Sequence, residues 1–193
     1  MTIHVLTTSA KKKMARFQLL SLLVLALAIS HSSSQAVAPS PGSTTRAQPP
    51  LNAAAQAYLD AHNKARAEVG VPPLKWSATL ANATSLLVRY QRDKQGCNFA
   101  NLSSGKYGGN QLWSSGSVVS PQEAVESWVA EKKFYNYANN SCPADHKCGV
   151  YTQIVWKKSL ELGCAQASCA KDASTLTICF YNPPGNIVGE KPY

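Results

Sequence analysis

Histidine, carboxylate and cysteine side chains are the groups of this 193-residue chain that could bind a metal or act in catalysis. His62 lies on the apolar stripe of a predicted helix, where an imidazole could serve as a general base or as a ligand. A histidine on such a face is more often a hydrogen-bonded core residue, and we favour that interpretation. His146 lies between Cys142 and Cys148 and has no partner histidine in any motif. These histidines do not by themselves predict a metal centre.

The six cysteines show neither CxxC nor Cys/His zinc-finger spacing, so thiolate ligation of a metal is not predicted. Behind a secretory leader, six cysteines predict three disulfides, although their number alone allows fifteen pairings. Cysteines held in disulfides cannot act as nucleophiles, and the chain has no nucleophile-elbow sequence. We therefore expect neither an enzyme of the serine or cysteine triad type nor a cofactor.

The N-terminal region has the features of a signal peptide. A basic segment at 11–16 precedes an apolar run at 17–29. Roughly 13 residues is the length of a signal-peptide core and is too short to span a bilayer comfortably. The extension before the basic segment is atypical, so Met14 is an alternative start. No second hydrophobic segment follows, and we expect a soluble product secreted to the extracellular space.

The composition after the apolar run divides the rest of the chain. Cleavage after Ala36 is favoured over cleavage after Ala38, because Pro39 would follow the second site. The next residues are rich in proline, serine, threonine and alanine and lack periodicity, as flexible linkers do. The predicted parts are a signal peptide with an atypical N-terminal extension at 1–36, a flexible linker at 37–50 and one folded domain at 51–193.

The charge of the chain is moderately basic. It has 19 lysines and arginines against 10 acidic residues, a formal charge of +9. Removing the leader removes four basic residues, which leaves 19 − 4 = 15 against 10, or +5. These charges are scattered along the sequence and accompany no nucleic-acid-binding motif, so we expect no nucleic acid partner.

Hydrophobic periodicity predicts helices at 52–69 and 77–91, and a third helix that begins at Ser120. The third helix starts with a capping box, in which the side chains of Ser120 and Glu123 each accept a hydrogen bond from the other residue's backbone amide. Pro121 occupies the first helical position, where the missing amide hydrogen costs nothing.

Alternation of apolar and polar residues predicts a strand at 148–156 and two more at 162–167 and 176–181, the last two joined by a polar turn at 171–174. The segment 97–116 is rich in glycine, serine and asparagine, and we predict a loop there. Sequons for N-glycosylation occur at Asn82, Asn101 and Asn139.

Several separated motifs resemble those of the CAP superfamily, which comprises cysteine-rich secretory proteins, antigen 5 and pathogenesis-related class 1 proteins. They are HNKAR at 62–66, LKW at 74–76, YGGN at 107–110, CGVYTQIVW at 148–156, LGC at 162–164 and the terminal PPGNIVGEKPY. The resemblance is greatest for the plant pathogenesis-related class 1 branch and extends over 51–193. It implies an α+β fold, a three-layer α–β–α sandwich with a central antiparallel sheet, stabilised by disulfides Cys97–Cys169, Cys142–Cys148 and Cys164–Cys179.

Many members of this superfamily hold two histidines and two glutamates in a cleft, where imidazoles can bind zinc. The matching residues here are Asn101 (or Leu102, because the loop is one residue longer), Gly109, Glu131 and Val150. Only Glu131 retains a ligand, and one carboxylate cannot hold a first-row ion strongly. The resemblance therefore implies a degenerate site without a metal or a catalytic residue. We expect Glu131 to accept hydrogen bonds from backbone amides instead.

Relatives in this superfamily also bind sterols or related lipids through an apolar pocket and an aromatic-containing loop. The residues of this chain that match that region, and are therefore the candidate ligand contacts, are Tyr107, Leu112 and Trp113.

The C-terminal peptide is a second feature that this chain shares with the superfamily. The family pattern matches Pro183, Gly185, Asn186, Pro192 and Tyr193. In relatives this segment can be released as a defence signal after an acidic residue, whereas here Asn182 precedes it.

Together these features predict a secreted, monomeric and non-enzymatic defence protein that binds a sterol or another apolar ligand, or an extracellular protein partner. The alternative is a precursor whose active product is the terminal peptide 183–193. A metal-dependent hydrolase is the third hypothesis.

Overall fold

The computed structural model describes residues 50–103, 105–169 and 173–193. The predicted signal peptide and all but the last residue of the predicted linker lie outside the described residues, as do positions 171 and 172 of the polar turn. Within the described residues the elements are α1 (Ala53–Ala67), β1 (Lys75–Trp76), α2 (Ala78–Lys94), β2 (Gly108–Ser114), α3 (Pro121–Val129), the 3₁₀ helix η1 (Ala130–Phe134), α4 (Gly149–Ile154), β3 (Glu161–Ser168) and β4 (Thr175–Asn182).

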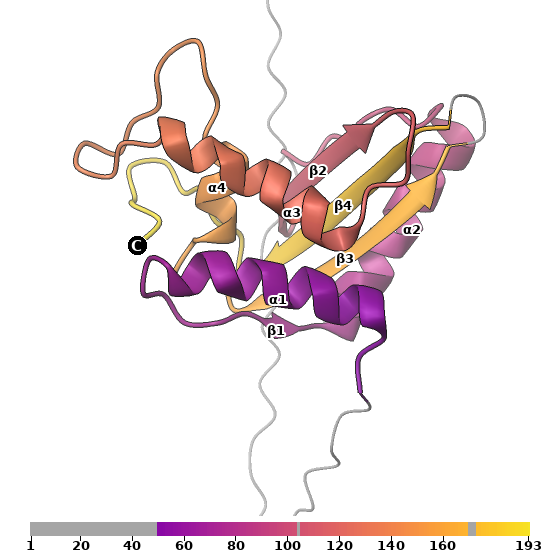
Figure 1. The fold of residues 1–193 in the computed structure, drawn as a ribbon, viewed down its shortest axis with the longest axis horizontal. Helices are drawn as coiled ribbons and strands as arrows, with labels where there is room; N and C mark the ends of the chain where they lie inside the picture. Colours follow the sequence, from indigo (N-terminus) through magenta and orange to yellow (C-terminus); the bar gives the residue numbers. More distant parts are fainter. Residues whose placement is uncertain (1–49, 104, 170–172) are drawn as a thin grey trace, which may run out of the picture. The chain divides into compact units, whose positions relative to one another are not determined.

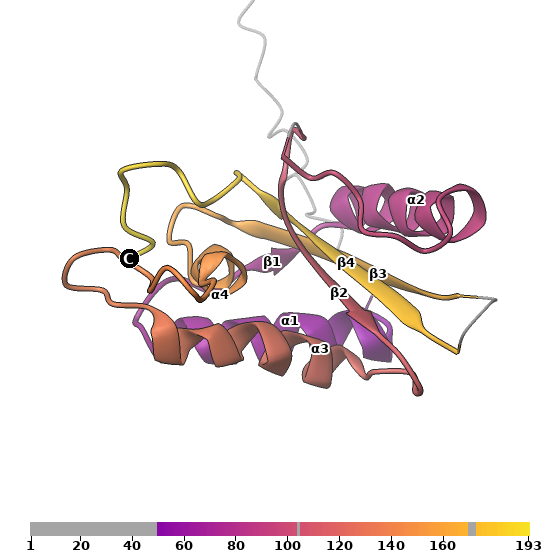
Figure 2. The same cartoon turned by 90° about the horizontal axis from the view of Figure 1, so that it is seen from above.

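The strands form one sheet in the order β1-β3-β4-β2, and helices cover both of its faces. Figures 1 and 2 show α1 and α3 on one face and α2 on the other, which is the expected α–β–α sandwich. The sheet is mixed, however, because β1 pairs with β3 in parallel while the other pairings are antiparallel. β1 has only two residues, too few for a period-two pattern, so the sequence predicted neither this strand nor its pairing.

Side-chain caps fix the starts of α1, α2 and α3. Asn52 accepts a hydrogen bond from the Ala55 amide at 2.9 Å and begins α1. The predicted capping box of α3 is confirmed, with Ser120 Oγ accepting from the Glu123 amide at 3.2 Å and Glu123 Oε2 accepting from the Ser120 amide at 2.8 Å. Gly70, with φ of +70°, follows the end of α1 in the left-handed conformation that glycine adopts most readily.

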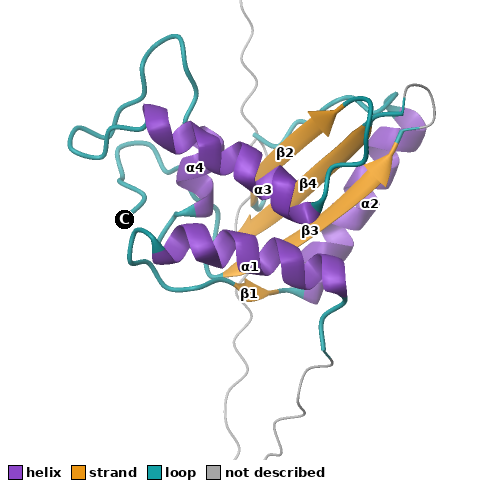
Figure 3. Cartoon of the chain, in the orientation of Figure 1, coloured by secondary structure: helices purple, strands orange, loops and turns teal. Residues whose placement is uncertain are grey.

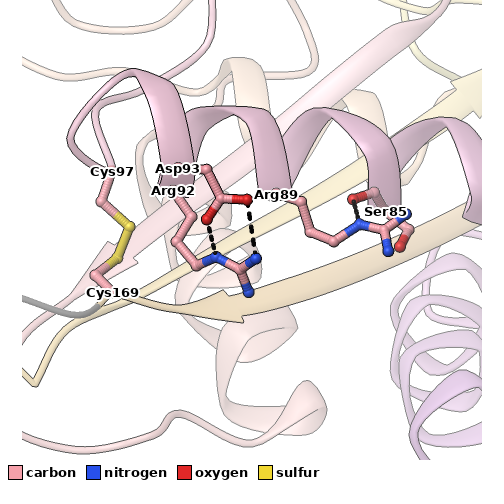
Figure 4. A network of polar contacts seen from close by, with 6 residues as sticks. All are labelled: Ser85, Arg89, Arg92, Asp93, Cys97 and Cys169. Carbon is pink, nitrogen blue, oxygen red and sulfur yellow. Dashed lines mark hydrogen bonds and ion pairs between the residues drawn. A yellow bond between two sulfur atoms is a disulfide. The ribbon is translucent and has the colours of Figure 1, made fainter.

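The core has one part on each face of the sheet, because successive side chains of β4 point to opposite faces. Cys179 and Tyr181 pack toward α1 and α3, while Leu176 and Ile178 pack toward Val88 of α2. The three cystines follow the pairing that the resemblance implies: Cys97–Cys169, Cys142–Cys148 and Cys164–Cys179. Figure 4 shows the first of them just beyond the C-terminal end of α2, near the exposed Arg92–Asp93 ion pair.

The segment 148–156 is not a strand as predicted, because its central residues form helix α4 (Figure 3). All six side chains from Tyr151 to Trp156 are buried, so neither a helical nor a strand period separates an inner from an outer face. Thr152 Oγ1 donates back to the Cys148 carbonyl at 3.1 Å, a bond within one helical turn. Complete burial therefore made the alternation uninformative.

The segment 97–116 is also not a loop throughout, because β2 occupies its second half and pairs with β4 from Gly108 to Ser114. Two of the glycines that predicted a loop, Gly108 and Gly109, are needed for close packing. A Cβ on Gly108 would lie 2.3 Å from Gln153 Oε1, a separation that real Cβ atoms do not show. Glycine here marks a close approach within a strand.

Candidate functional site

Two of the four positions of the degenerate site contact each other. Glu131 lies in η1, and its Oε2 accepts a hydrogen bond from the Val150 amide at the start of α4, at 3.1 Å. The Val150 carbonyl in turn accepts from Asn110 Nδ2 at 2.9 Å. The prediction that Glu131 accepts from a backbone amide is therefore confirmed.

The other two positions lie together on the opposite side of β2. A Cβ on Gly109 would lie 2.7 Å from Leu102 Cδ1 and 3.5 Å from Phe180, so the leucine fills the space that a larger residue would need. Asn101 is exposed, and its Oδ1 accepts from the Ser103 amide at 3.0 Å. Because neighbouring residues of a strand face opposite sides, Gly109 faces the α2 side while Asn110 faces Val150.

The donors at these positions do not fit a metal ion. Val150 offers a hydrocarbon side chain, Gly109 offers none, and Glu131 is engaged with a backbone amide. Among residues 50–103, 105–169 and 173–193, no group of three or more histidines, cysteines, aspartates or glutamates could hold an ion. His146 stacks on Phe134, the last residue of η1, with ring centroids 3.6 Å apart.

A buried polar network lies beside Val150. Asn110 Nδ2 donates to the Tyr181 hydroxyl at 3.0 Å, and that hydroxyl lies 2.8 Å from His62 Nε2. His62 Nδ1 lies 2.7 Å from the Tyr58 carbonyl, which can only accept. Nδ1 therefore carries the proton, and Nε2 accepts from Tyr181. The interpretation of His62 as a hydrogen-bonded core residue is confirmed, since its side chain is 0% exposed.

The network holds its histidine neutral. Burial lowers the pKa of His62 to about 4, although the hydrogen bond to the Tyr58 carbonyl opposes this, and the charge of Arg66 lowers the pKa further. Burial also raises the pKa of Tyr181 well above its usual value. A neutral imidazole whose two nitrogens are both engaged with buried partners has no access to a substrate. This network is structural.

Sequence analysis missed the role of Arg66, which is 0% exposed. Its guanidinium donates hydrogen bonds of 2.7 to 3.1 Å to four backbone carbonyls, those of Pro72, Ile154, Trp156 and Ser159. Burial lowers the pKa of Arg66 to about 10, so it stays charged at neutral pH. The available signal was an arginine in the last turn of a predicted helix, one helical turn beyond His62.

The candidate ligand contacts do not form one surface. Leu112 packs into the core near α1 and α3, and Tyr107 lies against Phe180 with ring centroids 5.5 Å apart. Trp113 is 42% exposed and, with Phe99, lines a hollow of about 340 Å³. Phe99, 58% exposed, was not predicted, because it lies in a segment without periodicity.

A second cavity, of about 380 Å³, lies between α1 and α3. Small and branched apolar residues line it together with charged and amide side chains: Ala57, Ala61, Ala65, Val125, Val129, Asp60, Lys64, Glu68, Gln122 and Glu126. An apolar lining with polar groups able to fix orientation suits a largely hydrocarbon ligand. We call this cavity the α1–α3 groove.

The terminal segment 183–193 is held against α4 and the segment 135–141. Its contacts include the Gly185 amide to Gln153 Oε1 at 3.0 Å, the Lys157 amide to the Pro192 carbonyl at 2.7 Å, and stacking of Tyr193 on Tyr137 with centroids 4.6 Å apart. Release of the terminal peptide would require cleavage of the peptide bond between Asn182 and Pro183. This bond lies at the end of β4, where the Asn182 carbonyl accepts from the Leu160 amide at 2.9 Å. The folded chain therefore does not present this bond in an extended, accessible loop.

Comparison with known proteins gives a consistent result. The sequence model of the Cysteine-rich secretory protein family (CAP) matches residues 59–181. The STS14 protein of Solanum tuberosum is 76% identical over 140 residues, which cover 72% of this chain and 65% of that protein, just under two thirds of its length. Pathogenesis-related protein 1C of Nicotiana tabacum is 40% identical over 182 residues, 94% of this chain and 96% of that protein.

A solved structure shares the fold. Venom allergen-like protein 4 of Schistosoma mansoni is 28% identical, with a TM-score of 0.55 over 74% of this chain and 95% of that protein. Among the described residues, no helix has the length and apolar character needed to cross a membrane.

Proposed function

Because the chain belongs to the cysteine-rich secretory protein (CAP) family and is of the plant pathogenesis-related class 1 type, we propose that it is a secreted, non-enzymatic defence protein that binds a sterol or another apolar ligand. The observation that carries the non-enzymatic part is the state of the degenerate site. Leu102 fills the space beside Gly109, and Glu131 holds the Val150 amide. A metal-activated water would need several converging donors, which these residues do not supply.

The non-enzymatic part is tested by metal analysis of secreted protein. We expect less than about 0.1 mole of zinc per mole of chain after dialysis, because a single carboxylate binds such an ion weakly. Isothermal titration with zinc should show no saturable site. About one tightly bound ion per chain would revive the metal-dependent hydrolase.

The α1–α3 groove supports the ligand-binding part, since its apolar alanines and valines would contact hydrocarbon while polar groups fix a hydroxyl or carboxyl end. Binding of a fluorescent sterol and of a fluorescent fatty acid should saturate at about one molecule per chain and be unaffected by a chelator. A broad lipid screen without a ligand would remove this part of the proposal.

Matched variants locate the ligand. Ala61→Trp fills the groove, whereas Ala67→Trp adds the same side chain on an exposed position of α1 that does not line it. We expect the first variant to weaken binding at least about tenfold and the second to leave it unchanged. If Trp113→Ala abolishes binding and Ala61→Trp does not, the ligand occupies the Trp113 hollow instead.

The alternative, release of the terminal peptide, remains a proposal with a clear test. The contacts of segment 183–193 and the position of the Asn182 bond at the end of β4 favour an intact protein. Mass spectrometry of extracellular fluid after elicitation should therefore find the chain with Tyr193 attached. Accumulation of a free peptide beginning at Pro183 would make the precursor function the better one.

Secretion itself is supported by the predicted signal peptide and by three cystines, which form and persist in oxidising compartments. Expression of the full chain in plant cells should deliver it to the apoplastic fluid, with residue 37 as its new N-terminus. Retention of the full-length chain inside the cell would contradict this.

A further inference from the structure

The terminal segment 183–193 lies against a short hairpin at 136–141, which follows η1. Figures 1 and 2 both show the end of the chain beside the loop that contains this hairpin. Two backbone hydrogen bonds of 2.9 and 3.1 Å close the hairpin at its ends. Asn140 Nδ2 then donates to the Glu190 carbonyl at 2.9 Å, across 50 residues of sequence. Two distant segments are therefore held together on the surface of the protein.

Two tyrosines stack where these segments meet. The rings of Tyr137 and Tyr193 have centroids 4.6 Å apart and planes inclined by only 4°, which is close contact for an aromatic pair. The Tyr137 hydroxyl donates to the Tyr193 carbonyl oxygen at 2.6 Å. Lys191 Nζ lies over the Tyr137 ring, 4.5 Å from its centroid, and donates to the Ala138 carbonyl at 3.1 Å. These contacts hold the two phenols in one arrangement.

An oxidant in solution can reach this pair. Tyr137 is 42% exposed, and Tyr193 is partly exposed. A surface hollow of about 710 Å³, lined in part by Tyr137, lies beside it. A second tyrosine pair, Tyr135 and Tyr151, has centroids 6.0 Å apart and planes inclined by 54°, and Tyr151 is only 1% exposed. The first pair therefore combines close parallel rings with access from solvent.

We propose that Tyr137 and Tyr193 form an intramolecular dityrosine bond when a peroxidase-type one-electron oxidant acts on the protein with hydrogen peroxide. The oxidant removes one electron and the hydroxyl proton from each phenol. The two phenoxyl radicals bond through the carbons ortho to their oxygens, and the proton on each of these carbons moves to the phenol oxygen. Hydrogen peroxide takes up the two electrons and two protons and becomes two waters, so the chain loses two hydrogen atoms.

The stacking favours a bond within one molecule over a bond between two. Groups held in contact have an effective concentration in the millimolar range or above, whereas protein at about 10 µM offers partners only at that concentration. The bond joins the terminal segment 183–193 covalently to the hairpin. A chain cut after Asn182 then keeps the segment attached, which is the opposite of peptide release.

The test uses the full secreted chain at the same concentration, treated with a peroxidase in the presence and absence of hydrogen peroxide. We expect a monomer with dityrosine fluorescence and an intact mass lower by two hydrogen atoms. After reduction of the disulfides, tryptic digestion should yield the peptide at 134–147 joined to the peptide at 172–193. Fragmentation of the joined peptides should place the bond on Tyr137 and Tyr193.

Matched variants separate the stacked pair from exposed tyrosines in general. Tyr137→Phe and Tyr193→Phe each keep a ring and remove a phenol, and each should lower the yield of monomeric dityrosine at least about tenfold. Tyr90→Phe removes a tyrosine of α2 that is 52% exposed and lies outside the pair, so the yield should not change. Unfolding the wild type in urea should also lower the yield at least about tenfold, because the two segments then separate.

The inference goes beyond the proposed function, and its failure is recognised separately. Dityrosine found only in covalent dimers, or bonds that involve Tyr90, overturn it. An unchanged yield in Tyr137→Phe does so as well. A peroxidase preparation that dimerises free tyrosine but leaves the chain unlinked is equally decisive against it. Zinc content and lipid binding are measured on unoxidised protein, so each of these outcomes leaves the proposed function intact.

Discussion

Two polar regions contact the Val150 backbone: the network that contains Asn110, at its carbonyl, and the degenerate site that contains Glu131, at its amide. They differ in the number and burial of their hydrogen bonds. The network of His62, Tyr181 and Asn110 is buried, and each of its links is a hydrogen bond of 3.0 Å or less. The degenerate site contributes two hydrogen bonds, from the Val150 amide to Glu131 and from the Ser103 amide to the exposed Asn101, and a leucine packed beside a glycine.

The comparison shows that the polar side chains of these regions mainly stabilise the fold by hydrogen-bonding to main-chain groups. Arg66, Asn110 and Glu131 all bond to main-chain groups of segments distant in sequence, and these bonds position α4 against the sheet. Replacing such a residue leaves buried partners unsatisfied, which costs more than losing the bond itself. Of the four positions of the degenerate site, Glu131 is the one whose loss carries that cost.

The largest effect is expected at Arg66. Arg66→Met removes the guanidinium that donates to four backbone carbonyls, although the Trp156 carbonyl still accepts from the Ser159 amide at 3.0 Å. We expect a loss of more than about 3 kcal/mol in the free energy of unfolding, measured by urea denaturation. Arg66→Lys keeps the charge but has three donors and no planar fork, so its loss should be smaller. A loss below about 1 kcal/mol for the methionine variant would mean that the network is not what holds α4.

The second effect is a pH dependence from His62. The unfolded chain takes up a proton near pH 6.5, whereas the folded chain resists protonation until about pH 4. The contribution of neutral His62 to the free energy of unfolding is therefore fully present above pH 6.5. It decreases as the pH falls toward 4, by up to about 3 kcal/mol.

His62→Gln removes this titration. The variant should be less stable at pH 7 but lose less stability between pH 6.5 and 4 than the wild type, as measured by urea midpoints at each pH. Carboxylates contribute equally to both proteins and cancel in the difference. Parallel pH profiles would show that protonation of His62 does not limit acid stability.

A smaller effect is expected when the degenerate site receives its missing carboxylate. Gly109→Glu forces its side chain against Leu102 and should cost about 2 kcal/mol, detected as a lower thermal midpoint. Adding Leu102→Ala makes room, so the double variant should be more stable than the sum of the two single changes predicts. Simple additivity would mean that the two side chains do not compete for the same space.

The smallest effect is expected at Glu131. Glu131→Ala leaves the Val150 amide without its acceptor, at a cost of about 1 kcal/mol in chemical denaturation. Glu131→Gln retains an acceptor oxygen and should stay within about 0.3 kcal/mol of the wild type. An equal loss in both variants would assign the role to the negative charge rather than to the hydrogen bond.

Much of the fold could be predicted because its signals are local. The capping box at Ser120 and the strands now seen as β3 and β4 depend on residues a few positions apart. The resemblance supplied the layer order and the cystine pairing, which no local pattern contains.

The rest depends on contacts between distant residues. Gly108 belongs to a strand because the Gln153 side chain occupies the space of its Cβ, and the sequence shows only a glycine. Trp113 and Leu112 are both candidate ligand contacts, but as neighbours on a strand they face opposite sides of the sheet. Arg66 was assigned no role, because its four acceptors lie 6 to 93 residues away.

The hydrogen bonds of Arg66 also determine which of the two helices that line the α1–α3 groove can move more easily. Arg66 bonds the C-terminal end of α1 to the backbone carbonyls of 154, 156 and 159. Moving this helix outward would break those hydrogen bonds and leave a buried charge without partners, which is energetically costly. α3 is held mainly by the apolar packing of Val125 and Trp128, with one hydrogen bond of 3.3 Å from the indole nitrogen to the Gln111 carbonyl. Movement of α3, rather than of α1, would therefore open the groove to the ligand proposed for it.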